Sequence, residues 1–195
     1  MTRRAILSVV AAVVVVALLA WGLTVALERI MRPEVRVTEQ APAPRDQVDT
    51  PQRHITATLY FASNDAQHLV PVQREVPYGE GAVEQGRQLV LAQIAADANA
   101  PNLRVVPATA TLRSFYISER GEAFVDLGPE LAAAHPGGSA AEQLTVYAIV
   151  NAVAANLPAV TTVQLMVEGK EVDTLAGHVD IRRPLRRNDA IVKTE

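Results

Sequence analysis

The residues of this chain that could do chemistry are few and widely spaced. No two of the four histidines share a helical turn, and none lies in an HExxH or HxH pattern; they are His54, His68, His135 and His178. Metal ligands supplied by one helix or strand need such close spacing, so these histidines predict loop or strand-edge positions rather than a metal site. The chain contains no cysteine, which excludes disulfides and thiolate metal ligands.

Nucleophilic catalysis needs a serine or threonine beside a base and an orienting acid, and the chain has no GxSxG, SxxK or P-loop pattern. Ser139 and Glu142 have the spacing of a capping box, in which each side chain accepts the backbone N–H of the other. Asp126 and Glu130 could form a carboxylate pair, but Asp126 lies beside Gly128 and is typical of an acid at a strand end. We therefore expect no enzyme activity and no cofactor.

Binding residues are suggested at three places. Asn151 interrupts the apolar face of a predicted helix, where it contacts a ligand or, as is commoner for a buried amide, bonds a neighbouring backbone group. The tyrosines at 60, 116 and 147 predict rims of the core rather than a stacking platform. The candidate partner-binding residues form a basic cluster that either contacts an anionic partner or lies in a solvated tail; they are Arg182, Arg183, Arg186 and Arg187.

The elements that must position these residues lie in a domain over residues 55–183. Alternating apolar residues predict strands over 55–61, 69–76, 111–118, 122–128, 162–167 and 178–181. Helical spacing predicts helices over 82–97 and 140–157, the second well buried, with a short helical turn at 130–134. Pro71 places its strand at a sheet edge or a bulge. The order predicts an α+β fold, a two-layer sandwich with two helices on one face of a mostly antiparallel or mixed sheet.

An apolar run near the N-terminus predicts a membrane anchor. It covers residues 5–27 without a charge and is broken only by Ser8, Gly22 and Thr24. At about 1.5 Å per residue this transmembrane helix would span roughly 30–35 Å, the thickness of a bilayer core. A cleaved signal peptide is the alternative, although its apolar region usually has only about 7–15 residues. Residues 1–4, with Arg3 and Arg4, form a cytoplasmic stub, so we expect a single pass through the cytoplasmic membrane with an extracytoplasmic domain.

Two further segments complete the organisation. Residues 28–54 form a charged, Pro-rich linker, in which Ala41-Pro42-Ala43-Pro44 favours extended backbone. Residues 184–195 are polar and predict a flexible tail. The net charge of −3 gives no case for nucleic-acid binding.

Several segments, taken in order, resemble the GerMN domain, named after a germination and sporulation protein. They are LYF at 59–61, LVPVQREVP at 69–77, FVDL at 124–127, GSAAE at 138–142, VYAIVN at 146–151, and residues 163–169 and 177–180. The resemblance covers about residues 55–181 and implies a single copy of a non-catalytic binding or assembly module, similar to ring-building modules of envelope complexes. Family members occur in spore-forming machinery and in lipoproteins beside sensor kinases. With no cysteine to carry a lipid, this chain differs from the lipoproteins, and the apolar run at 5–27 takes the place of the lipid anchor.

Two functions follow as expectations. The first is a membrane-anchored, extracytoplasmic protein-interaction or assembly module of the bacterial cell envelope, with envelope proteins or a second copy as partners. The alternative is a domain that binds cell-wall polymer or a small ligand, to which the arginine cluster or Asn151 would contribute. An envelope hydrolase would additionally need a pocket in which a nucleophile or carboxylate lies within hydrogen-bond reach of a base.

Overall fold

The computed structural model describes residues 53–95 and 104–193, together with Trp21. The chain divides into two compact units, Met1–Thr50 and Pro51–Glu195, and the second contains the predicted domain. No helix within the described residues is long and apolar enough to cross a membrane. The predicted membrane helix at 5–27 falls outside that part of the chain except for Trp21, as does nearly all of the predicted linker.

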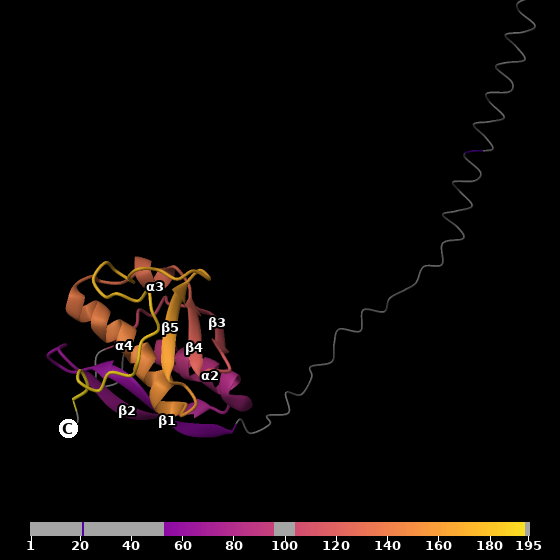
Figure 1. Cartoon of the computed structure of the whole chain (residues 1–195), viewed down its shortest axis with the longest axis horizontal. Helices are drawn as coiled ribbons and strands as arrows, with labels where there is room; N and C mark the ends of the chain where they lie inside the picture. Colours follow the sequence, from indigo (N-terminus) through magenta and orange to yellow (C-terminus); the bar gives the residue numbers. More distant parts are fainter. Residues whose placement is uncertain (1–20, 22–52, 96–103, 194–195) are drawn as a thin grey trace, which may run out of the picture. The chain divides into compact units, whose positions relative to one another are not determined.

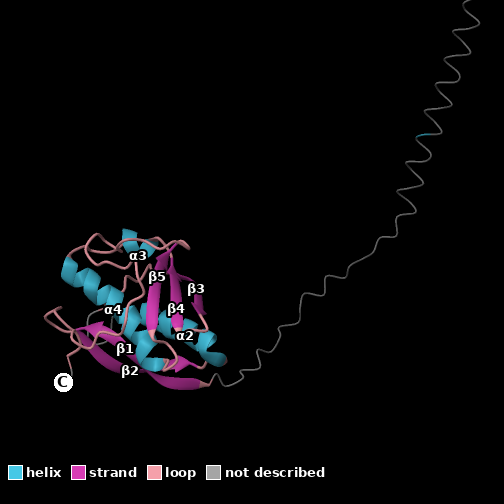
Figure 2. Ribbon diagram, in the orientation of Figure 1, coloured by secondary structure: helices cyan, strands magenta, loops and turns pink. Residues whose placement is uncertain are grey.

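The second unit has an α+β fold (Figures 1 and 2). In chain order its elements are β1 (His54–Ala62), β2 (Leu69–Pro77), α2 (Gly81–Ala95), β3 (Leu112–Ile117), β4 (Glu122–Leu127), α3 (Glu130–Ala133), α4 (Ser139–Asn156) and β5 (Thr162–Val167). Each lies within two residues of a predicted element at either end. The predicted strand over 178–181 does not form; those residues are irregular.

The strands form two sheets, so the prediction of one sheet is wrong. β1 pairs antiparallel with β2, and the second sheet has the order β3-β4-β5, with β3 antiparallel and β5 parallel to β4. As the position of Pro71 predicted, β2 lies at an edge. A parallel pair needs a long crossover, which here contains α3 and α4.

The two sheets stay separate because helix side chains occupy the edge of β1 that faces away from β2. The backbone N–H of Thr58 donates to Asn156 Oδ1 at 2.9 Å, and Asn156 Nδ2 donates back to Thr58 O at 2.8 Å. Gln93 makes the same pair of hydrogen bonds with the backbone of Tyr60, at 2.9 and 2.7 Å. These amides satisfy backbone groups that another strand would otherwise pair with.

The core lies between the helices and the two sheets. α4 packs on β1 and β5, while α2 packs on β3, on the β1–β2 sheet and beside α4. α4 buries residues on almost all sides, as its alanine- and valine-rich sequence predicted. α2 approaches β3 closely at Gly86, where an added Cβ would lie 2.2 Å from the Phe115 ring. A larger residue at this position would therefore push the helix off the sheet.

Residues 181–193 form a C-terminal strap, so the predicted flexible tail is wrong for the residues up to 193. Val163 of β5 and Leu185 exchange two backbone hydrogen bonds of 2.8 Å. Farther along, Leu69 of β2 accepts from the N–H of Lys193 at 2.8 Å and donates to Ile191 O at 2.7 Å. The tail sequence is polar, but it is held through its backbone, which hydropathy does not report.

Candidate functional site

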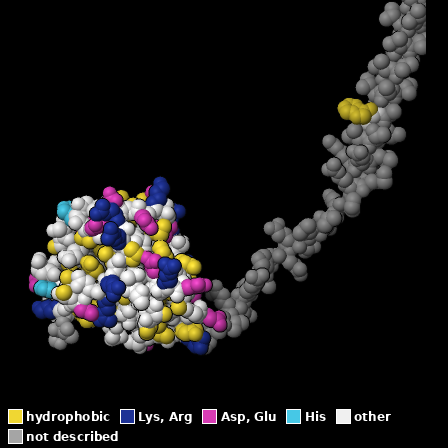
Figure 3. Space-filling model, in the orientation of Figure 1, with side chains coloured by type: hydrophobic (Ala, Val, Ile, Leu, Met, Phe, Trp, Pro, Cys, Tyr) yellow, Lys and Arg dark blue, Asp and Glu magenta, His cyan; other side chains and the backbone are white. Residues whose placement is uncertain are grey.

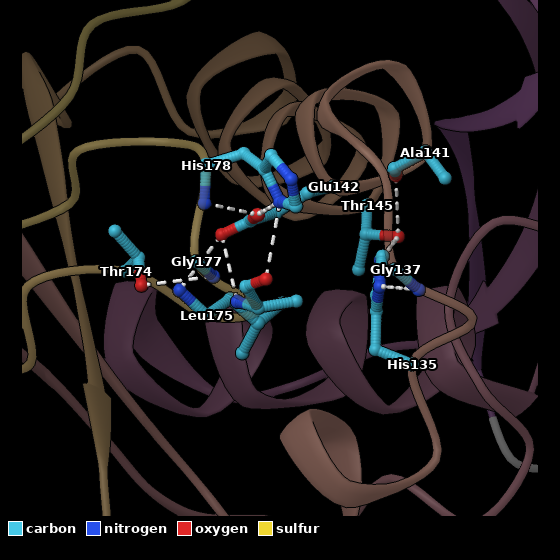
Figure 4. A network of polar contacts seen from close by, with 10 residues as sticks. His135, Gly137, Ala141, Glu142, Thr145, Thr174, Leu175, Gly177 and His178 are labelled. Atoms are coloured by element: carbon cyan, nitrogen blue, oxygen red, sulfur yellow. Dashed lines mark hydrogen bonds and ion pairs between the residues drawn. The ribbon is translucent and has the colours of Figure 1, made fainter.

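The histidines lie where the sequence predicted, in loops or at strand ends. His54 begins β1 and His68 precedes β2, whereas His135 and His178 lie in loops. Among the described residues, no group of three or more His, Asp or Glu side chains is arranged to hold a metal ion. Two of these histidines contact groups of α4 (Figure 4).

His135 and Thr145 form a pair that could be taken for a base and a nucleophile. His135 Nε2 lies 3.1 Å from Thr145 Oγ1. His135 Nδ1, however, accepts the backbone N–H of Gly137 at 3.0 Å, so the ring proton lies on Nε2 and is donated to the threonine. The Thr145 hydroxyl in turn donates to Val105 O at 2.6 Å. The imidazole therefore has no free lone pair toward Thr145, and the pair ties the loop before α4 to the helix.

Glu142 lies in the first turns of α4 and accepts several hydrogen bonds. It does not form the predicted capping box with Ser139. α4 begins at an N-cap Gly138 with φ +88° and has no side-chain cap. Glu142 is completely buried, and its Oε1 accepts the backbone N–H groups of Leu175 and Ala176 at 2.9 and 2.8 Å. Its Oε2 accepts the backbone N–H of His178 at 2.8 Å and lies 3.2 Å from His178 Nδ1 (Figure 4). The backbone here turns toward the carboxylate, which is why no strand forms over 178–181.

The ionised form of Glu142 is favoured by its surroundings. Burial by itself would raise the pKa of the carboxyl group. Hydrogen bonds from four backbone N–H groups lower it, and they outweigh the burial, so the pKa of Glu142 lies below its ordinary value. A buried carboxylate is therefore an integral part of the fold.

Asp126 and Glu130 do not form a carboxylate pair that could act on a substrate. Asp126 Oδ1 accepts the backbone N–H of Gly169 at 2.7 Å and holds the turn after β5, while its Oδ2 pairs with Arg113 at 3.2 Å. Glu130 instead accepts the Thr111 hydroxyl at 3.1 Å. The sequence prediction of a strand-end acid at Asp126 is confirmed.

Asn151 is also structural, as the commoner alternative predicted. Its Nδ2 donates to Asn188 O and its Oδ1 accepts from Asn188 N, both at 2.9 Å. Asn151 is fully buried on α4, so this amide fixes the middle of the strap to the helix.

We expect Asn151→Leu to lower the free energy of unfolding by about 2 kcal/mol, because both backbone groups of Asn188 lose their partners while the number and branching of the side-chain heavy atoms stay the same. The amide of Asn188 should also exchange faster with solvent. Asn188→Ala is the matched control, since it keeps the backbone groups that Asn151 binds. Unchanged protection of the Asn188 amide in Asn151→Leu would contradict this role.

The arginine cluster lies along the strap, and all four side chains are exposed. Arg182 pairs with Asp180 at 2.6 Å, and its side-chain and backbone hydrogen bonds lower the pKa of Asp180 to about 2. Arg187 pairs with Asp189 at 2.7 Å. Figure 3 shows basic and acidic side chains interspersed on the visible face rather than gathered by sign. Nearby carboxylates thus offset part of the positive charge of the strap.

A pocket of about 550 Å³ opens at the N-terminal end of α4. Gly137, Gly138 and Ser139 line it together with Arg104 and Thr145. Both glycines have positive φ, at +82° and +88°, a conformation that other residues rarely adopt. The hydroxyl of Thr145 is bonded within the fold, as described above, and Gln67, Arg104 and Ser139 are the other polar residues that line the pocket.

The edge of β3 is the surface best suited to bind another chain. Ser118 N–H donates to Glu122 O at 2.9 Å, and alternation from this pair turns the N–H and C=O groups of Phe115 and Ile117 away from β4. No backbone hydrogen bond joins these outward groups to any residue that the structure describes. Tyr116 beside them is 58% exposed and lies 6.2 Å, centroid to centroid, from Phe124.

The other sheet edges are covered or blunted by the chain itself. Asn156 and Gln93 cover β1, and Leu185 covers β5 at Val163. The edge of β2 meets the strap at Leu69 and carries two prolines, which lack the N–H that a pairing strand needs. Within the described residues β3 has neither protection, although a bulge at Arg113 interrupts its first part.

Comparison with known proteins identifies the family. Residues 58–173 match the sequence model of the family described as "Germane: Sporulation and spore germination". No curated protein matches. A putative lipoprotein from Clostridium perfringens is 26% identical with a TM-score of 0.51, and the match covers 70% of this chain and 89% of that one.

Two structures of the sporulation protein GerM from Bacillus subtilis share the fold at 18% identity. For its tandem GerMN domains the TM-score is 0.54, and the match covers 69% of this chain and 46% of that one. For its first GerMN domain the TM-score is 0.51, and the match covers 68% and 98%. The family match and the shared fold lead to one conclusion: the chain belongs to the Germane family of GerMN-type sporulation and spore germination domains.

Proposed function

We propose that this protein is a non-catalytic interaction module of the cell envelope that joins a protein partner through the edge of β3. The observation that carries this proposal is the pair of outward-facing residues Phe115 and Ile117, whose backbone groups have no partner among the described residues. An extended segment of a partner would add a strand there, with main-chain hydrogen bonds for affinity and the exposed Tyr116 ring for a side-chain contact.

The polar side chains support a non-catalytic role. Glu142, Asn151 and Asp126 are each bonded to the backbone of a distant segment, and the Thr145 hydroxyl oxygen accepts a hydrogen bond from His135 instead of donating its proton to the ring. Groups used in this way hold the fold together and are not poised for proton transfer.

An envelope location is supported by two further observations. The relative from Clostridium perfringens is described as a putative lipoprotein, a class of protein held at a membrane by lipid. This chain has no cysteine but carries the apolar run at 5–27, which we propose as its membrane anchor, with residues 28–54 as the linker to the domain.

Single-cysteine variants test this function cleanly, because the chain has no cysteine of its own. Ser114→Cys places one thiol on the exposed part of β3, and Arg186→Cys places one on the strap as a matched exposed control. After labelling with a thiol-reactive photo-crosslinker in membranes of the source cell, we expect one protein adduct of discrete mass from the β3 variant and little from the control. No adduct from β3, or equal yields of the same adduct from both positions, would contradict the proposal.

A further inference from the structure

A second pocket, of about 450 Å³, lies between the β1–β2 sheet and the strap, away from the edge of β3. Tyr60, Thr58 and Gln73 line the side formed by the strands, and Arg187 and Asp189 line the side formed by the strap. Pockets of this size commonly hold small molecules, which they orient through a few convergent polar groups.

Tyr60 supplies a hydroxyl that the fold does not use. Only 2% of the residue is exposed, and its backbone groups are bonded to Gln93. The hydroxyl makes no hydrogen bond to a described residue. His68 Nδ1, and not this oxygen, is the described side-chain atom that is both buried from solvent and without a hydrogen-bond partner. The hydroxyl oxygen of Tyr60 is therefore accessible to solvent, and it faces the pocket that Tyr60 lines. Burial raises the pKa of the phenol, so it is a neutral hydrogen-bond donor at physiological pH.

The polar groups around this hydroxyl offer both donors and acceptors. Arg187 uses Nε to bind Asp189 at 2.7 Å, and its two terminal nitrogens form no hydrogen bond within the described part of the chain. Gln73 Nε2 donates to Thr58 Oγ1 at 2.9 Å, which leaves Gln73 Oε1 as an acceptor and the Thr58 hydroxyl proton as a donor. A guanidinium beside a phenol suits a carboxylate, and the acceptors of Asp189 and Gln73 suit an adjacent N–H group.

We propose that this pocket binds an amino acid or short peptide through its free carboxylate, with Arg187 and the Tyr60 hydroxyl as the carboxylate donors. The ligand amine or amide N–H groups face Asp189 and Gln73. Since the strap provides Arg187 and Asp189, ligand binding also stabilises the strap against the β1–β2 sheet. This site is separate from the β3 edge and does not depend on the proposed protein contact.

Dialanine and dialanine amide are the probes, titrated by ligand-observed NMR into the full chain in detergent micelles. We expect saturable binding of dialanine, and at least tenfold weaker binding of the amide, which lacks the carboxylate. Arg187→Gln should weaken dialanine binding at least about tenfold and abolish the preference over the amide, because a charge-assisted hydrogen bond is lost. Tyr60→Phe should weaken it about three- to tenfold, as expected for one neutral hydrogen bond.

Arg182→Gln is the matched control, since Arg182 forms the same kind of pair with a carboxylate two residues away but does not line the pocket. The affinity of Arg182→Gln for dialanine should stay within about twofold of the affinity of the unmodified chain. The melting temperature of ligand-free Tyr60→Phe should be unchanged, because the fold does not bond the hydroxyl. The proposal is overturned if dialanine does not saturate, if the amide binds equally well, or if Arg182→Gln weakens binding as much as Arg187→Gln.

Discussion

Glu142→Gln is expected to lower the free energy of unfolding by about 2–4 kcal/mol, because a buried carboxylate that accepts several backbone N–H groups is lost. Glutamine keeps the size of the side chain but replaces one acceptor oxygen by an NH₂ group. That group would face either the donors of Leu175 and Ala176 or the donors of His178. Chemical denaturation at neutral pH measures the effect, with faster amide exchange over 175–178 as its local signature.

The pH dependence of stability separates this role from simple packing. Because the pKa of Glu142 is lowered in the folded chain, its contribution is fully present above the unfolded pKa near 4.5 and is lost as the pH falls through the folded value below it. The unmodified chain should therefore lose stability in acid more steeply than Glu142→Gln. Glu119→Gln is the control, since Glu119 is an exposed residue of the turn between β3 and β4. Parallel pH profiles for the unmodified chain and Glu142→Gln would contradict this role of the carboxylate.

Ile117→Pro is expected to reduce the crosslinked adduct of Ser114→Cys at least about tenfold, because proline removes an outward N–H that a partner strand needs. The β3–β4 hydrogen bonds should survive, since the N–H of Ile117 faces away from β4. Ile117→Ala is the matched control: it loses at least as much side-chain packing but keeps the N–H. We expect Ile117→Ala to retain the adduct within about twofold.

Adduct yield is measured beside the melting temperature of each variant, so that loss of binding is not confused with unfolding. Equal loss of the adduct in both variants would show that the partner contacts the Ile117 side chain rather than the strand backbone. Full retention in Ile117→Pro would show that the partner does not pair with β3.

Periodicity and composition predicted the helices and strands of the described domain because their apolar residues recur at strand or helical spacing. The alternation at 55–61 and the helical spacing at 140–157 predicted β1 and α4, although both elements bury more than the one face that the patterns indicate. The predicted strand at 178–181 does not form, because the backbone N–H groups of His178 and Val179 bond Glu142 and that of Ile181 bonds Asp173 O. The spacing of Ser139 and Glu142 predicted a capping box. The residues near Glu142 in the sequence do not indicate that its carboxylate binds the distant backbone at 175–178.

For a similar reason, the sequence did not predict that the strands divide into two sheets. Gln93 and Asn156 are polar residues on mostly apolar helices, which signals a buried hydrogen bond but does not name its partner. The sequence did not predict the strap, because the tail has few apolar residues, Leu185 and the stretch 190–192, and is held by backbone pairing. The open edge of β3 became visible only once the other strand edges were seen to be occupied.

Residue-resolved amide hydrogen exchange tests most directly whether the domain joins its partner at β3. The chain is measured alone and in the crosslinked complex. We predict that the amides of Phe115 and Ile117 exchange rapidly in the free chain and at least about tenfold more slowly in the complex, while Tyr116, already bonded to β4, changes little. Unchanged exchange at Phe115 and Ile117, together with new protection on another surface, would contradict the proposed docking edge.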